Sequence, residues 1–194
     1  MISVIIPTHN AERQLVPTLA ALVPGVTAGM LRDVILADGG STDDTSAIAD
    51  AAGCAFYQGV SDVGLRLKQA VGHGRGHWLL FLHAGSLLEE GWVREVSAFI
   101  EGAERRGMAE RVAATFRLSV DGYGLAPRLG EAVAAARLAM LGRPKPGQGL
   151  LLSRRHYDRL GGHAPGRKAE ARLIARVGMR RLQVLRAKVL LPSR

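Results

Sequence analysis

The stretch Ile2-Ser-Val-Ile-Ile-Pro-Thr-His-Asn10 decides how the fold begins. Its first five residues form a β-branched apolar run that ends at Pro7, and this pattern predicts a short buried strand. Apolar residues at helical spacing follow over residues 11–22, and Pro24-Gly25 predicts where that helix ends. A second apolar run over residues 33–37 predicts another buried strand. The chain is therefore expected to open with a strand–helix–strand unit.

The same alternation continues along the chain. After the second strand comes Gly39-Gly-Ser-Thr-Asp-Asp-Thr45, in which Ser41 and Asp44 have the spacing of a capping box for a helix ending at Ala52. The remaining predicted strands are residues 54–57, 78–82, 112–118 and 149–153, and the remaining predicted helices are residues 64–71, 91–100, 129–141 and 169–177. Strands separated by helices of this length form parallel sheets that helices cover. We therefore expect an α/β fold, with a mostly parallel sheet in a three-layer α/β/α sandwich, as a single domain over residues 1–194.

Positive charge is concentrated in the last part of the chain. The net charge is +9, and residues 143–194 hold 14 Lys and Arg against two acids, which makes that segment +12. Such a segment attracts phosphate-bearing partners, either nucleotide diphosphates or an anionic membrane surface, although a basic face can also serve solubility alone. Aromatic residues are only 5% of the chain, so a stacking platform for nucleic acid is not expected.

Cysteine content and the N-terminus bear on the compartment. Cys54 is the single cysteine, which excludes an internal disulfide, and no basic leader precedes the first predicted strand. No apolar run approaches the roughly 20 residues that a membrane-spanning helix needs. We expect a cytoplasmic protein, or one peripheral to the inner face of the membrane.

Polar residues that directly follow strands are the first candidates for a site, because ligands of open α/β sheets bind beyond the carboxyl ends of the strands. Asp38 ends the second predicted strand and is followed by two glycines. Its carboxylate suits the N–H or O–H donors of a base or ribose. An Asx-turn that only closes the strand would use the same residue, and the sequence alone leaves both interpretations open.

Two motifs carry a family resemblance. Ser3-Val-Ile-Ile-Pro-Thr-His-Asn10 with Glu12, followed by Ile35-Leu-Ala-Asp-Gly-Gly-Ser-Thr-Asp-Asp-Thr45, resembles the opening of the family 2 glycosyltransferases, which have a GT-A fold. Shorter matches to a small bacterial subgroup of that family recur in the same order, at Arg66-Leu-Lys-Gln69, Leu79-Leu-Phe-Leu-His-Ala-Gly85, Gly147-Gln-Gly-Leu150, Arg154-Arg155 and Leu160-Gly-Gly162. The resemblance implies transfer of a sugar, with inversion, from a nucleoside-diphosphate sugar such as a UDP-sugar.

The resemblance also implies a set of donor-binding residues. It assigns residues 1–110 to the nucleotide and residues 111–194, the basic half, to an unknown acceptor that a lipid could carry. Within it, Asp38 contacts the base, and Arg66 and Gln69 lie near the pyrophosphate or ribose. The other candidates for the donor pocket are Pro7, Thr8, Asn10, Glu12, His83 and Gln148. Ordinary turn, cap and surface roles remain alternatives for Thr8, Asn10 and Arg66.

The chain departs from the family pattern where a metal is held. Family members bind a divalent cation through acids after the fourth strand, since Mg²⁺ and Mn²⁺ need oxygen ligands. The subgroup has His-Ala-Asp there, whereas this chain has His83-Ala84-Gly85-Ser86. Gly147 stands where the subgroup has another acid, and Glu89 and Glu90 are expected to belong to the following helix. The sequence therefore identifies no residues as metal ligands.

A third departure concerns the general base. The family places an acidic Glu-Asp pair where this chain has Ala169-Glu170, and the register set by Leu173 and Arg176 puts Glu170 at the position of the base. A slip of one residue would put Ala171 there and leave no base. Glu170 is thus the candidate catalytic residue.

Two hypotheses account for the lost acids. In one, basic side chains neutralise the diphosphate in place of a metal, with Arg154, Arg155, Arg167 and Lys168 as candidates. In the other, the protein is a non-catalytic nucleotide-sugar-binding or scaffold protein.

Overall fold

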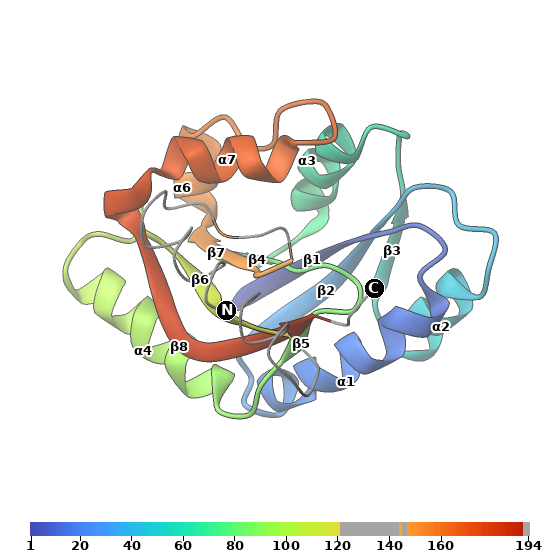
Figure 1. The fold of residues 1–194 in the computed structure, drawn as a ribbon, viewed down its shortest axis with the longest axis horizontal. Coiled ribbons are helices and arrows are strands. Elements are labelled where there is room, and N and C mark those ends of the chain that lie inside the picture. The colour runs from blue at the N-terminus through green and yellow to red at the C-terminus, as the bar shows by residue number, and fades with distance from the viewer. Residues whose placement is uncertain (121–143, 145–146, 192–194) are drawn as a thin grey trace.

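The computed structural model describes residues 1–120, 144 and 147–191, and every structural statement below concerns these residues. Their strands form one eight-stranded sheet in the order β3-β2-β1-β4-β7-β6-β8-β5 (Figure 1). The strands are β1 (Ile2–Thr8), β2 (Leu31–Asp38), β3 (Ala55–Gln58), β4 (Trp78–Phe81), β5 (Leu87–Leu88), β6 (Ala113–Val120), β7 (Leu150–Ser153) and β8 (Leu182–Leu191).

Parallel pairing dominates the half of the sheet that holds β1. β1 lies between β2 and β4 and is parallel to both, and β3 extends this group in the same direction. β7 then pairs antiparallel with β4 and β6, whereas β6 and β8 are parallel to each other. The carboxyl ends of β1, β2 and β4 consequently meet at one edge, which is where the sequence predicts the site.

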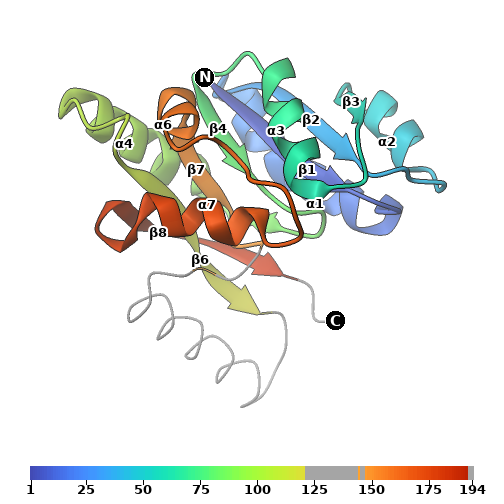
Figure 2. The same cartoon turned by 90° about the horizontal axis from the view of Figure 1, so that it is seen from above.

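Helices cover both faces of the sheet (Figures 1 and 2). The described helices are α1 (Glu12–Thr27), α2 (Thr45–Ala51), α3 (Val63–His73), α4 (Trp92–Arg105), α6 (Arg154–Arg159), α7 (Ala169–Val177) and the 3-10 turn η1 (Met179–Arg181). Successive side chains of a strand point to opposite faces, so Val4 and Ile6 pack with α1, α2 and α4, whereas Ile5 packs with α3, α6 and α7. This arrangement confirms the predicted three-layer α/β/α fold.

The predicted end of the first helix is wrong, because α1 continues through Pro24 and Gly25 to Thr27. Proline removes one backbone hydrogen-bond donor from a helix, and here the packing of α1 against Trp92 of α4 compensates for that loss. Gly25 lies under the indole of Trp92, whose Nε1 donates to the carbonyl of Ala21 at 3.1 Å. The close approach of these two elements holds the last turn of α1 in place.

Two local predictions after β2 and β4 are also wrong. Asp44 precedes α2 without any side-chain cap, and Ser41 bonds Asp38 and Asn10 instead of the helix. Glu89 and Glu90 lie in the turn before α4 and are not part of that helix.

Four of the described elements were not predicted, namely β5, α6, η1 and β8. The predicted helix over residues 129–141 lies outside the described residues. No helix in the described part of the chain is long and apolar enough to cross a bilayer.

Candidate functional site

The loops after β1 and β2 are interlocked by hydrogen bonds. The backbone N–H of Asn10 donates to Oγ of Ser41 at 2.8 Å, and Oδ1 of Asn10 accepts from the N–H of Thr42 at 2.8 Å. The N–H of Ala11 donates to Oγ1 of Thr45 at 3.0 Å. Asn10 has a φ of 49°, a left-handed conformation that Asn adopts more readily than most residues. The two predicted motifs therefore build one structure at the sheet edge.

Asp38 is the centre of this structure and is fully buried. Its Oδ1 accepts from the hydroxyls of Thr8 at 2.9 Å and Ser41 at 2.5 Å, and its Oδ2 accepts from the N–H groups of Gly40 at 2.8 Å and Ser41 at 2.7 Å. Burial alone raises the pKa of Asp38, but the hydrogen bonds from Ser41, Thr8 and Gly40 together lower it below its ordinary value. Asp38 is thus an ionised carboxylate that orders the loop.

Pro7 and Glu12 flank this centre. Pro7 lies in β1 opposite Ala37 of β2. The N–H of Glu12 donates to Oδ2 of Asp43 at 3.1 Å, and Oε2 of Glu12 accepts from the N–H of Asp44 at 3.3 Å. The structure therefore gathers Pro7, Thr8, Asn10, Glu12 and Asp38 at one end of the sheet, as the sequence predicts.

A cleft of about 670 Å³ opens beside the loop that follows β2. Its lining residues come from the ends of β1 and β2, the start of α3 and the segment before α7, and they are His9, Gly39, Ser61, Asp62, Val63, Arg66, Gly166 and Arg167. Two of the side chains are guanidinium groups and one is a carboxylate. The cleft therefore favours an anionic ligand.

Arg66 forms the floor of the cleft. Its side chain is buried, with Nε donating to the carbonyl of Ala37 at 3.0 Å and Nη1 donating to the carbonyls of Val60 at 2.9 Å and Ser61 at 3.1 Å. A Cβ atom on Gly39 would lie only 3.0 Å from the guanidinium, so glycine lets the chain pass directly over it. Burial lowers the pKa of Arg66, and the carboxylates of Asp38 and Asp62 oppose that change.

Asp62 closes the far side of the cleft and was missed in the sequence analysis. Its Oδ1 caps α3 by accepting from the N–H of Leu65 at 2.9 Å, and its Oδ2 accepts from the N–H of Gly166 at 2.7 Å. An Asp directly before an apolar helical run is the usual signal for such a cap. The contact with Gly166, which is 104 residues away, could not be predicted from spacing.

A second polar group lies beyond the end of β4. Nε2 of His83 is 2.7 Å from Oε2 of Glu170, which lies in the first turn of α7. The side chain of His83 is 39% exposed and that of Glu170 is 15% exposed. The predicted general base and the predicted donor-binding histidine are therefore a single pair.

The residues around this pair do not fit a divalent metal. Gly85 and Gly147 have φ values of 91° and 90°, in the left-handed region where a side chain is strained. Oγ of Ser86 donates to the carbonyl of Gly147 at 3.0 Å, so it is already used. Hard cations need several oxygen ligands, and the described residues contain no cluster of three His, Cys, Asp or Glu that could hold a metal.

Of the nine predicted donor-binding residues, Arg66 lines the cleft; the residues that do not are Pro7, Thr8, Asn10, Glu12, Asp38, Gln69, His83 and Gln148. Gln69 is exposed on α3. Gln148 is buried, and its Nε2 donates to the carbonyl of Phe116 in β6 at 3.1 Å. Their assignment to the donor stays a prediction.

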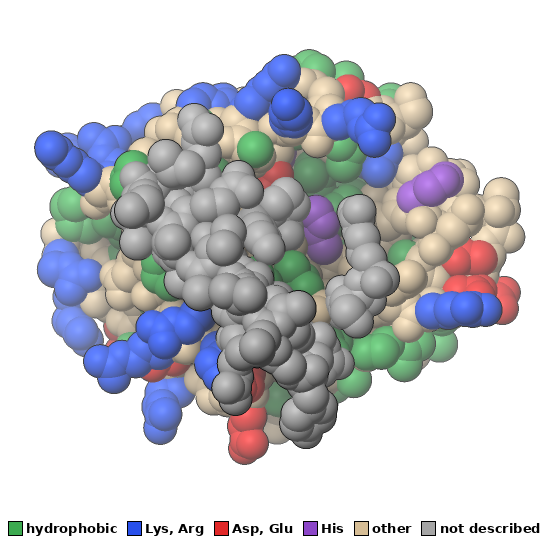
Figure 3. Space-filling model, viewed as in Figure 1, with side chains coloured by type: hydrophobic (Ala, Val, Ile, Leu, Met, Phe, Trp, Pro, Cys, Tyr) green, Lys and Arg blue, Asp and Glu red, His purple; other side chains and the backbone are tan. Residues whose placement is uncertain are grey.

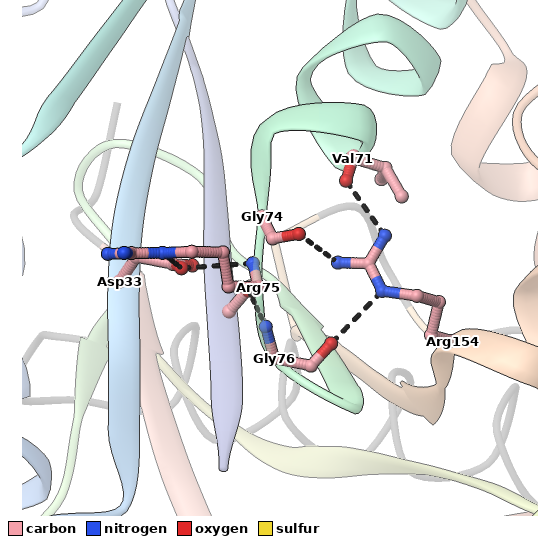
Figure 4. Close-up of polar contacts among 7 residues, drawn as sticks. Asp33, Val71, Gly74, Arg75, Gly76 and Arg154 are labelled. Carbon is pink, nitrogen blue, oxygen red and sulfur yellow. Dashed lines mark hydrogen bonds and ion pairs between the residues drawn. The ribbon is translucent and has the colours of Figure 1, made fainter.

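The structure overturns the idea that Arg154 and Arg155 neutralise a diphosphate, because they lie at the amino end of β4, away from the cleft. Arg154 donates to the carbonyls of Val71 at 2.8 Å, Gly74 at 2.8 Å and Gly76 at 3.0 Å (Figure 4). Arg155 pairs with Glu110 at 3.2 Å. Arg167 does line the cleft, and Lys168 is exposed next to it.

A cleft at the carboxyl ends of parallel strands is the place where open-sheet α/β proteins bind their ligands. The model of glycosyl transferase family 2 matches residues 3–110, which is more than half of the chain. The protein belongs to that family, and its fold is the GT-A fold.

Solved structures with the same fold include two bacterial enzymes. One is glucosyl-3-phosphoglycerate synthase from Mycobacterium tuberculosis in complex with Mn²⁺, UDP and glucosyl-3-phosphoglycerate, with a TM-score of 0.64 and 22% identity over 99% of this chain and 70% of that one. The other is S. aureus TarS in complex with UDP, with a TM-score of 0.69 and 16% identity over 99% of this chain and 60% of that one. No curated protein matches the sequence.

Proposed function

We propose that this protein binds a UDP-sugar in the cleft over Arg66 and transfers the sugar to an acceptor. The observation that carries the proposal is the cleft itself, which Arg66 and Arg167 both line together with Gly39 of the loop that Asp38 orders. The exposed guanidinium of Arg167 can bind phosphate oxygens in a pair of hydrogen bonds, and the buried Arg66 adds positive charge to the same cleft, so this cleft suits a diphosphate. UDP as the carrier is supported by its presence in both solved neighbours.

Calorimetry with UDP, GDP and CDP, each with and without Mn²⁺, tests the donor site. We expect UDP to bind without metal. Arg167→Ala should weaken binding about tenfold, because an ion pair with phosphate is lost. Arg181→Ala is the matched control, since Arg181 is exposed on η1 and does not line the cleft. Absence of binding by all three nucleotides would overturn the proposal.

Turnover separates the transferase from the non-catalytic alternative. UDP-glucose hydrolysis, in which water replaces the unknown acceptor, can be followed as UDP release with EDTA present. Activity that survives EDTA supports transfer without a metal. UDP binding without any turnover supports a nucleotide-sugar-binding protein instead.

The acceptor side is proposed to face an anionic membrane, which is where a lipid-linked acceptor would be presented. Lys and Arg side chains gather along the edge over α7 and the start of β8 (Figure 3). Arg180 and Arg181 are exposed there beside Met179, which is 48% exposed. Basic residues next to an exposed apolar side chain are typical of peripheral contact with anionic lipid.

Co-sedimentation with vesicles tests this contact. The wild type should bind phosphatidylcholine vesicles only when they contain phosphatidylserine, and binding should fall as salt rises. The double variant Arg180→Ala, Arg181→Ala should bind less, whereas Arg105→Ala, Arg106→Ala at the end of α4 should not. Equal binding to neutral vesicles would contradict the proposal.

A further inference from the structure

His83 and Glu170 are held against each other by two elements that are far apart in the sequence. His83 follows β4, and Glu170 lies in α7, 87 positions further along the chain. The N–H of His83 donates to Oγ of Ser86 at 3.3 Å, and the N–H of Gly85 donates to Oγ1 of Thr18 at 2.8 Å. The backbone turn that carries the imidazole is therefore fixed from two sides.

The two side chains differ in how they face solvent. The imidazole of His83 is 39% exposed, whereas the carboxylate of Glu170 is 15% exposed and has one oxygen engaged with Nε2. Among the described residues, Nδ1 of His83 has no hydrogen-bond partner, so the pair offers an imidazole nitrogen to an incoming hydroxyl more readily than it offers the carboxylate.

The carboxylate of Glu170 acts on the pKa of His83. Burial lowers the pKa of His83, but the hydrogen bond and negative charge of Glu170 outweigh it and raise the pKa above its ordinary value. His163, which feels the charge of Glu170 from the segment before α7, has a pKa near 4 because it is buried. Arg176 of α7 is engaged by the carbonyls of Leu160 and Gly162. Glu170 therefore favours a proton on His83, whereas burial disfavours a proton on His163.

We propose that His83 is the proton acceptor of the transfer reaction and that Glu170 is its positioning residue. This inference rests on the proposed function and differs from the sequence prediction, in which Glu170 itself is the base. The carboxylate holds the Nε2–H tautomer and leaves the lone pair of Nδ1 free. It also stabilises the imidazolium that forms, as the acid does in a catalytic triad.

The proposed transfer forms one bond to the anomeric carbon of the sugar and breaks another. Nδ1 takes the proton of the acceptor O–H group while the acceptor oxygen forms a bond to the anomeric carbon. The bond between that carbon and the diphosphate oxygen breaks, and its electron pair leaves with the nucleoside diphosphate. The imidazolium then returns its proton to solvent.

The pH profile of kcat/KM for UDP-glucose hydrolysis assigns the two roles. His83→Gln should lower kcat/KM by about 10²–10⁴ and abolish the acid limb, because the base is gone. Glu170→Gln should retain more activity than His83→Gln, and its acid limb should move to lower pH, because the imidazole loses its anionic partner. A Glu170→Gln variant that is as inactive as His83→Gln, or a His83→Gln variant that keeps the limb, would overturn the proposal.

A titration of the histidine ring signals by NMR adds a measurement that does not need turnover. The signal that His83→Gln removes identifies His83, and His77→Gln, at an exposed site outside the pair, serves as the control. The pKa of His83 should fall in Glu170→Gln. If UDP fails to bind but the titration changes as expected, the proposed function is wrong and the pair is real. If UDP binds and the titration does not change, the pair is wrong.

Discussion

Nε2 of His83 lies 2.7 Å from Oε2 of Glu170, and this contact joins the end of β4 to the first turn of α7. The segment after β4 is where family members hold their metal. In this chain Gly85 and Gly147 adopt left-handed conformations there, and among the described residues Glu170 is the one carboxylate paired with the imidazole. The loss of the acids and the formation of the pair are therefore two aspects of one local structure.

Restoring an acid at Gly85 should not restore a metal site. Gly85→Asp forces a side chain onto a backbone with φ of 91°, which costs about 1–3 kcal/mol of stability. We expect a lower urea midpoint and unchanged UDP affinity on addition of Mn²⁺, measured by calorimetry. Tighter UDP binding with Mn²⁺ in this variant would show that the site tolerates a cation.

Removing the charge of Asp38 should destabilise the fold. Asp38→Asn places an amide against donors that now bond a carboxylate, and we expect a loss of about 1–3 kcal/mol at pH 7. Because its pKa is lowered on folding, the stability that Asp38 contributes is present above about pH 4 and is lost as the pH falls further. The Asp38→Asn variant should not show this loss of stability in acid. The control Asp50→Asn, at an exposed position on α2, should behave as wild type.

His163 should make the protein sensitive to acid. It is buried, its Nε2 has no partner among the described residues, and burial lowers its pKa to about 4. The unfolded chain binds the proton near pH 6.5, so folding stability should fall by about 3 kcal/mol as the pH drops from about 7 to 4. His163→Phe should remove most of this slope in urea titrations, whereas His77→Gln should keep it.

Arg154 should be a structural residue. Arg154→Ala leaves the carbonyls of Val71, Gly74 and Gly76 without their charged donor, and we expect a loss of about 2–4 kcal/mol. Arg155→Ala removes only an exposed pair with Glu110 and should change stability little. Neither variant, where folded, should weaken UDP binding; a specific loss of affinity in Arg154→Ala would place it at the donor after all.

Gly25 should be required by the packing of α1 on α4. A Cβ atom there would lie 2.6 Å from Cη2 of Trp92, so Gly25→Ala should cost about 1–3 kcal/mol. Gly72→Ala on α3 is the control, because its Cβ would have nothing within 4 Å and alanine favours a helix. Thermal unfolding should therefore shift in opposite directions in the two variants.

The parts of the fold predicted from the sequence are those in which local pattern and burial coincide. β1 and β4 are apolar runs buried on both faces of the sheet, and α7 begins and ends where its spacing predicts. β8 was missed although Leu185, Ala187 and Val189 alternate with exposed or half-buried residues, because Arg186 and Lys188 interrupt its hydrophobic character. α6 has six residues, five of them charged or His, and too few apolar positions to show a period.

The candidate site also has parts that the sequence predicts and parts that it does not. Asp38 and Asn10 lie in recognisable motifs directly after their strands, and the structure brings them together. The pairing of His83 with Glu170, and of Asp62 with Gly166, depends on how α7 and its preceding segment pack across the sheet. Such contacts arise from tertiary packing, which spacing along the chain does not encode.

The contacts of Arg154 also indicate when the N-terminal part of the sheet can become stable during synthesis of the chain. Its guanidinium gathers three carbonyls from the end of α3 and the segment that leads into β4, and β7, just before it, covers the edge of β4. Both contacts come from residues well after position 110, where the family match ends. A growing chain that has only reached that point exposes an apolar strand edge and is at risk of self-association. Residues 1–110 are therefore expected to become stable only after residues 150–154 have left the ribosome.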